Sequence, residues 1–222
     1  MDTLFSIIQN MLGANASLER FEKGSCIYQE GDPVEHVFIM INGRAKLINT
    51  LAGTKKEFIQ HIIYPNEFMG LAEFIFRMKK RRMSAVAVDR EVVMGKVPFF
   101  KFEMELRKNS RLADYIMAQL AKKGEGSWRR CFRRKHLSLK GVVIGALVDI
   151  ALERGIKTEE GVAIEGLSHR DLAEYTGVCR QGTSTALNML RRENKIAYGR
   201  KEILIKIKPL NHDNMLQRQL HP

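Results

Sequence analysis

One short stretch in the last quarter of the chain is rich in side chains that could recognise a large polar partner. Arg180 and Gln181 are adjacent, and three hydroxyl residues follow them, Thr183, Ser184 and Thr185. An arginine can donate two hydrogen bonds to guanine O6 and N7, and a glutamine can pair with adenine N6 and N7. The group is therefore typical of side chains that read base edges in a DNA groove.

A helix is needed to present these side chains. Ala186, Leu187 and Leu190 recur at helical spacing, whereas the polar residues crowd the first turns. A recognition helix contacts bases with that N-terminal end. We therefore expect such a helix from about Arg180, the alternative being a helical hairpin whose polar face is only solvated.

A second helix is expected just before it. Ser168 and Asp171 form an S-x-x-D start signal, and Gly177 in the following turn is free to adopt a positive φ. This spacing predicts a helix-turn-helix, in which Ser168 and His169 are further candidate DNA contacts. A hairpin of Lys195–Tyr198 with Ile203–Ile207 is predicted to form a wing, and a helix over Val142–Arg154 and a strand at Val162–Ile164 are predicted upstream.

In the first half of the chain the apolar residues follow the short repeat of β-strands instead of the longer repeat of a helix. Close, regularly spaced strands separated by turn residues predict an antiparallel barrel or sandwich that ends near Pro98. The predicted strands are Ser25–Glu30, Val37–Ile41, Arg44–Ile48, Phe58–Ile63, Ser84–Val88 and Glu91–Val97. An apolar helix over Met1–Gly13 is expected to cover an edge or end of this unit.

A long helix is predicted from Ser110 to Arg134. Leu112, Ile116 and Leu120 share one face of it, which we interpret as a dimer seam. Gly124 and Gly126 each cost about 1 kcal/mol in a helix interior, so a kink or break is expected there. The basic segment 127–140, which includes Arg133, is either a solvated hinge or a contact to DNA phosphates.

The amino-acid composition of the chain limits the kinds of partner that it could bind. The formal net charge of +12 over 222 residues favours a polyanion, and nucleic acid ranks above a membrane because no basic amphipathic segment with aromatic anchors is evident. No apolar run long enough for a membrane span and no signal-peptide layout is found, so a cytoplasmic location is expected. The three cysteines are far apart, so no disulfide framework or metal site is expected.

Two stretches carry a resemblance to a known family. They are Gly24–Pro33 with Val37–Met40 and Gly43–Leu47, and Leu172–Gly177 with Arg180 and Leu187–Leu190. Both are similar to motifs of the CRP/FNR family of bacterial transcription regulators, and the match runs over nearly the whole chain. The resemblance implies an α+β fold with three parts: an antiparallel β-roll like a cyclic nucleotide-binding domain (1–106), a dimerisation helix and hinge (107–139) and a winged helix-turn-helix (140–222).

The resemblance also implies a function. It predicts a homodimer that binds a palindromic operator in double-stranded DNA, works with RNA polymerase and catalyses no reaction. An unidentified signal at the β-roll is expected to switch it, and a small-molecule effector is one candidate for that signal. The candidate effector pocket comprises Met69, Gly70, Leu71, Arg82, Met83 and Ser84.

Departures from the family pattern leave the effector unidentified. Cyclic-nucleotide-binding members hold the phosphate with a Gly-Glu pair and an Arg-[ST]-Ala triplet, whereas this chain has Gly70-Leu71 and Met83-Ser84-Ala85. Glu73, Arg81 and Arg82 lie nearby, but a shift of one position along a strand turns a side chain to the other face. Cyclic AMP is therefore not expected to bind. The cysteine cluster of oxygen-sensing members is missing, and His36 and His61 are lone histidines, which disfavours an iron–sulfur cluster and haem.

Other functions remain open from the sequence alone. The regulator could act without a ligand, or through the redox state of Cys179, whose pKa a helix start and Arg180 could lower. A cupin-like metal enzyme would need paired histidines near a carboxylate, and an architectural DNA binder would rest on the charge alone.

Overall fold

The computed structural model describes residues 17–50, 57–199 and 202–206. The chain divides into two compact units, residues 1–127 and 128–222. The fold is α+β with antiparallel sheets, as predicted. The predicted helix over Met1–Gly13 lies outside the described residues, and the finer division at 106/107 and 139/140 stays a prediction.

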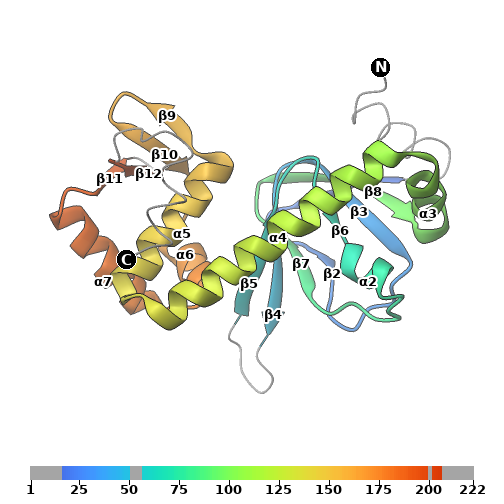
Figure 1. Ribbon diagram of the computed structural model, residues 1–222, viewed down its shortest axis with the longest axis horizontal. Coiled ribbons are helices and arrows are strands. Elements are labelled where there is room, and N and C mark those ends of the chain that lie inside the picture. Colours follow the sequence, from blue (N-terminus) through green and yellow to red (C-terminus); the bar gives the residue numbers. More distant parts are fainter. Residues whose placement is uncertain (1–16, 51–56, 200–201, 207–222) are drawn as a thin grey trace. The chain divides into compact units, whose positions relative to one another are not determined.

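Two four-stranded sheets build the first unit (Figure 1). Their orders are β1-β8-β3-β6 and β2-β7-β4-β5. The strands are β1 (Ser17–Glu22), β2 (Cys26–Tyr28), β3 (His36–Asn42), β4 (Ala45–Thr50), β5 (Glu57–Ile63), β6 (Phe68–Met69), β7 (Ser84–Ala87) and β8 (Glu91–Pro98). All six predicted strands form, and β1 and β6 are additional.

Alternation along β3 explains why this unit has two hydrophobic cores. Phe38 and Met40 face the interior of the roll, where they join Tyr28, Leu47 and other residues of both sheets. Val37 and Ile39, on the opposite face of the same strand, join a second core formed with the helices. Because successive strand residues point to opposite faces, one uninterrupted apolar strand serves both cores.

Three helices follow or interrupt the strands of this unit: α2 (Leu71–Ile75), α3 (Phe99–Lys108) and α4 (Ser110–His136). The expected break at Gly124 and Gly126 is wrong, because α4 is one continuous helix of 27 residues. Each glycine weakens the helix, but α4 is held near both ends. Leu112 and Ile116 are buried in the second core, and Arg133 is buried against α5.

The second unit contains three further helices and one sheet (Figure 1). The helices are α5 (Leu139–Arg154), α6 (His169–Thr176) and α7 (Arg180–Arg192), and the strands are β9 (Ile156–Thr158), β10 (Gly161–Glu165), β11 (Ile196–Gly199) and β12 (Glu202–Ile205). The sheet order is β11-β12-β10-β9. The predicted wing is confirmed, since β11 pairs with β12 and Ile196 lies opposite Ile205.

No helix within the described ranges is long and apolar enough to cross a membrane. The same residues contain no group of three or more His, Cys, Asp or Glu side chains that could hold a metal ion.

Candidate DNA-binding surface and sensor site

The start of α6 is fixed by reciprocal hydrogen bonds. The Ser168 hydroxyl accepts from the Asp171 backbone N–H at 3.1 Å, and the Asp171 carboxylate accepts from the Ser168 N–H at 3.2 Å. This capping box confirms the predicted start signal. Gly177 ends the helix with φ 66°, the left-handed conformation expected of the turn.

The beginning of α7 presents a polar, exposed face. Arg180, Gln181 and Thr185 are exposed, while Ala186, Leu187 and Leu190 are buried beneath them. The Thr185 hydroxyl donates to the Gln181 carbonyl at 3.0 Å, so it is partly engaged with the helix itself. Arg180 and Gln181 are therefore the exposed residues at the start of α7 whose side-chain N–H groups are best placed to donate to a partner.

One residue of the predicted contact set does not belong there. Thr183 has no exposed surface, so it cannot touch DNA, and the prediction is wrong for this residue. It shares the buried side of α7 with Leu187 and Leu190, at helical spacing. Asn188 was missed, although it is exposed and lies one helical turn beyond Thr185. The same spacing rule could have identified both residues.

The two candidates from α6 are positioned differently. Ser168 is exposed, but its hydroxyl also donates to Asp171 at 2.6 Å. His169 is half-buried, with Nδ1 3.2 Å from the Ser184 hydroxyl and its ring 5.7 Å from that of Tyr198. His169 thus links α6 to the recognition helix and to the wing, and Ser184 is half-buried at that link.

The basic segment at the end of α4 is part of the fold of the second unit. Arg133 is buried and makes a bidentate ion pair with buried Asp149 of α5, with Nη2 3.1 Å from one carboxylate oxygen. A side chain at Gly145 would collide with Arg133, since a Cβ there would lie 2.7 Å from its Nε. Arg133 is therefore neither a solvated hinge residue nor a phosphate contact.

Two neighbouring arginines bind α6. The Arg130 guanidinium lies 5.0 Å from the centre of the Tyr175 ring and donates to its hydroxyl at 3.2 Å. Burial raises the pKa of Tyr175, and the positive charge of Arg130 opposes that rise. Arg134 donates to the Thr176 carbonyl at 3.3 Å, at the end of α6 where carbonyls lack helical partners. The last turns of α4 are thus fastened to the helix-turn-helix.

The six candidate pocket residues of the first unit have different surroundings. Met69 lies in the core inside the roll, whereas Leu71 lies in the second core with the helices. Arg82 is exposed, and the half-buried Ser84 hydroxyl accepts from the Glu30 N–H at 2.9 Å. The grouping of these six residues as an effector pocket therefore stays a prediction.

The arginine that points inward is Arg81. It is only 4% exposed, its guanidinium lies 4.3 Å from the Tyr28 ring centre, and it donates to the His36 carbonyl at 2.7 Å. Its Nε and Nη1 have no hydrogen-bond partner among the described residues. Gly70, with φ 84°, leaves the room that Nη1 occupies, since a Cβ there would lie 2.5 Å from it. Burial raises the pKa of Tyr28, although Arg81 opposes that rise.

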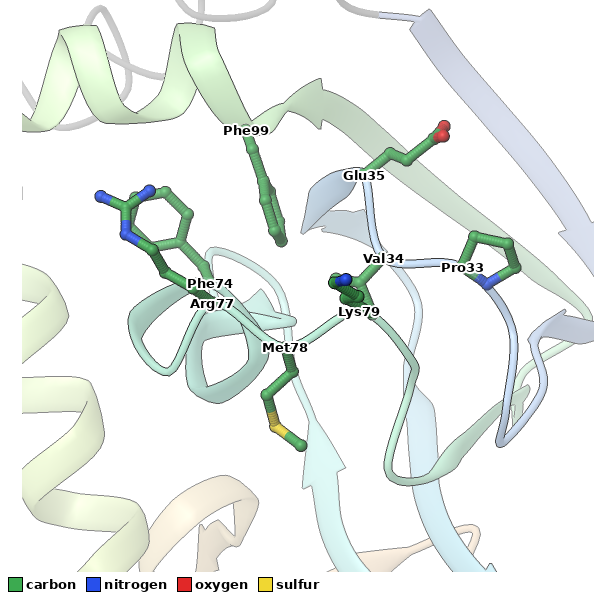
Figure 2. A pocket seen from close by; sticks show the side chains of 8 residues that line it. All are labelled: Pro33, Val34, Glu35, Phe74, Arg77, Met78, Lys79 and Phe99. Atoms are coloured by element: carbon green, nitrogen blue, oxygen red, sulfur yellow. The ribbon is translucent and has the colours of Figure 1, made fainter.

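An open cavity of about 300 Å³ lies elsewhere on this unit, at the end of the sheet where β8 passes into α3. It is lined by Pro33, Val34, Glu35, Phe74, Arg77, Met78, Lys79 and Phe99. Figure 2 shows the Phe99 ring pointing into the space between Phe74 and Val34. The Phe74 and Phe99 rings meet edge to face with centres 5.2 Å apart. None of the six predicted pocket residues lines this cavity.

Comparison with known proteins gives a domain match and several distant relatives. The model of the cyclic nucleotide-binding domain family matches residues 18–109. The chain is 23% identical over 189 residues to the global nitrogen regulator of Synechococcus elongatus, covering 85% of each chain. It is 20% identical over 194 residues to the cAMP-activated global transcriptional regulator CRP of Pasteurella multocida, covering 86% of this chain and 91% of that protein. Residues 18–109 thus match the cyclic nucleotide-binding domain family, and over most of its length the chain is similar to transcription regulators of the CRP/FNR type.

Solved structures of CRP/FNR-type regulators share the fold. The c-di-GMP responsive global regulator CLP of Xanthomonas campestris superposes with a TM-score of 0.76 at 17% identity, over 92% of this chain and all of that one (100%). A CRP/FNR transcriptional regulator from Thermus thermophilus gives 0.67 at 19% identity, over 90% of this chain and 97% of that one. The predicted architecture is therefore confirmed, and the predicted resemblance to CRP/FNR regulators agrees with the neighbours found.

In this chain the face of α4 predicted as the dimer seam is already occupied. Leu112 and Ile116 are buried in the chain's own second core, and Leu120 packs against that core. The buried Gln119 side chain makes two hydrogen bonds to the Phe68 backbone, at 3.0 and 2.8 Å, on the same side. The seam prediction is wrong because a single periodic apolar stripe does not reveal whether its partner is the same chain or another.

Proposed function

We propose that this protein is a sequence-specific DNA-binding transcription regulator. The observation that carries the proposal is the exposed polar start of α7, where Arg180 and Gln181 stand on a capped helix-turn-helix flanked by a paired wing. The relatives, named as transcriptional regulators, support it. The net charge of +12 favours the same polyanionic partner.

Base contacts come from the exposed face of α7. Arg180 pairs with a guanine and Gln181 with an adenine, and Asn188, whose amide can also pair with adenine, extends the readout towards the end of the site. Thr185, Ser184, Ser168 and His169 lie around this face and supply backbone contacts or orient it. Because two-fold protein symmetry is matched by half-site symmetry, the operator of a homodimer is a palindrome.

The homodimer uses the exposed side of α4. Met117 is 60% exposed, and the small residues Ala121 and Gly124 follow it at helical spacing, with Trp128 continuing the series at 55% exposure. A Cβ on Gly124 would meet nothing within 4 Å, so packing within the chain does not require a glycine there. Small residues at these positions let a second α4 approach closely.

This seam is tested by Met117→Asp. An unpaired charge at a helix pair should shift the protein to monomers in sedimentation experiments at micromolar concentration. Ala118→Asp, which adds the same charge at the next exposed position of α4, is the control and should remain dimeric. A dimeric Met117→Asp protein would place the seam elsewhere.

The effector is unidentified, so we propose only that the β-roll unit is the regulatory part. RNA polymerase is the proposed partner on DNA. The relatives named above are transcription regulators, and no catalytic role is proposed for any residue.

Arg180→Ala tests the proposed function. Loss of a bidentate arginine should cost about 1–3 kcal/mol on the operator and relax the preference at one base pair in each half-site. Selection of sites from random DNA at one salt concentration measures both effects. Arg192→Ala, at the exposed far end of α7, is the matched control and should recover the parent consensus. If Arg180→Ala recovers that consensus with equal discrimination, Arg180 is not a base reader.

A further inference from the structure

Three elements of the proposed DNA-binding surface meet at the side chain of His169. This residue is the first of α6 and is half-buried. Its Nδ1 lies 3.2 Å from the Ser184 hydroxyl of α7, which is a hydrogen-bond distance. The centre of its ring lies 5.7 Å from that of Tyr198 in β11, and the two ring planes are inclined by 39°. One imidazole therefore contacts the recognition helix and the wing at the same time.

Ser184 lies in the middle of the face of α7 that we propose reads bases. It comes four residues after Arg180 and four residues before Asn188, so the three side chains share one face of the helix. Recognition requires side chains that are held within about 0.5 Å of their productive positions. A hydrogen bond from His169 to Ser184 thus restrains this face one helical turn from each proposed base reader.

Tyr198 fixes the part of β11 that lies nearest the end of the hairpin. It shares a face of the strand with the buried Ile196, and Gly199, which ends β11, has no side chain. Within the described ranges the Tyr198 hydroxyl has no hydrogen-bond partner, so the contacts that hold this residue act on its ring. They include His169 and the Arg191 guanidinium, which lies 5.8 Å from the ring centre.

We infer that His169 is a positioning residue of the DNA-binding surface. Through Ser184 it orients the reading face of α7, and through Tyr198 it orients the end of the wing. The inference rests on the proposed function and adds to it the side chain that orients the two DNA-contacting elements relative to each other. His169 itself reads no base. The hydrogen bond governs base preference, whereas the ring contact governs the contacts of the wing with the DNA backbone.

Three substitutions in the full chain separate these two contacts. His169→Asn keeps a polar atom in the place of Nδ1, because both atoms are bonded to Cγ, but it removes the ring. His169→Phe keeps a ring beside Tyr198 but removes the hydrogen bond to Ser184. His169→Ala removes both contacts. Site selection from random DNA measures base preference, and ethylation interference on the selected operator maps the phosphates that the protein contacts. The phosphates of the wing are those whose interference is lost in Tyr198→Leu.

His169→Ala should lower operator affinity about tenfold, because a hydrogen bond and a ring contact no longer hold the surface in place. It should also weaken both the base preference and the interference at the wing phosphates. His169→Asn should restore the base preference alone, and His169→Phe should restore the wing interference alone. In a Ser184→Ala background, the matched control, His169→Asn should be no better than His169→Ala.

A different pattern would overturn the inference. If His169 contacts DNA directly, all three variants will lose the same single phosphate and keep the parent base preference and the wing interference. Affinity and preference equal to the parent in His169→Ala would also overturn it. A parent protein that selects no consensus would refute the proposed function instead. If circular dichroism shows that His169→Ala does not fold, the asparagine and phenylalanine variants decide, since each keeps one contact.

Discussion

Two consecutive arginines of the first unit, Arg81 and Arg82, have opposite environments. Arg81 is buried against Tyr28 and Gly70, whereas Arg82 is exposed. The sequence places both next to a motif in which the family uses an arginine, and only the local alternation of inward and outward positions separates them. Arg81 also carries two nitrogens without partners among the described residues, so its burial depends on packing more than on hydrogen bonds.

Arg81→Ala should therefore lower the free energy of unfolding by about 2 kcal/mol. The substitution removes the ring contacts and the hydrogen bond to the His36 carbonyl and leaves a gap in the core. Arg82→Ala, the matched control, should change it by less than about 0.5 kcal/mol, as surface substitutions do. Urea denaturation measures both. Equal losses would mean that Arg81 is not buried as described.

Thr183 shows the limit of residue type as a guide to the candidate site. A hydroxyl near the start of a recognition helix is plausible as a DNA contact, yet Thr183 lies on the buried side of α7 and its oxygen has no partner among the described residues. Position on the helix, three residues after Arg180, decides its environment. Arg180, Gln181 and Thr185 are exposed, as side chains that contact DNA must be.

At the scale of elements, the end of α4 is part of the DNA-binding unit. Arg130, Arg133 and Arg134 connect it to α5 and α6 through one ion pair, one aromatic contact and one helix-end carbonyl. A run of arginines without acids gives no sign of this in the sequence, because the acid that pairs with Arg133 is Asp149, on the next helix.

Arg133→Ala should destabilise the second unit by about 3–5 kcal/mol, because it removes the closest partner of the buried Asp149 carboxylate and leaves only Arg129, whose Nη1 lies 3.8 Å away. Arg133→Met combined with Asp149→Leu removes both charges and should recover most of that loss. Thermal unfolding of the two variants and the parent gives the comparison. A double variant as unstable as Arg133→Ala would show that packing, not the unpaired charge, dominates.

The helices and strands that could be predicted from the sequence are those whose own residues carry the full hydrophobic period or the capping signal. Strands β3 and β8 and helices α5, α6 and α7 each carry their own periodicity or cap. By contrast, β9 is exposed at all three residues and has no apolar alternation, and β6 has two residues, so neither offers a pattern. The dimer face was misassigned because Leu112 and Ile116 have their partners in Phe68 and Phe102, which are distant in sequence.

For the whole molecule, cyclic AMP at millimolar concentration should leave the melting temperature unchanged. Leu71 and Met83 stand where cyclic-nucleotide-binding relatives have the glutamate and arginine, Arg82 is exposed, and Arg81 is stacked on Tyr28. Binding at 100 times the dissociation constant would add about 2.7 kcal/mol, equivalent to several degrees. A shift of that size in differential scanning fluorimetry would refute the prediction.

The fastening of α4 to the helix-turn-helix also affects how the protein responds to ionic strength. Each phosphate that a protein cation neutralises releases counterions and steepens the dependence of log K on log salt by about 0.9. Arg133 is buried in its ion pair with Asp149, so it neutralises no phosphate and adds nothing to this dependence. A folded variant that lacks both Arg133 and Asp149 should therefore bind the operator with the same salt dependence as the parent.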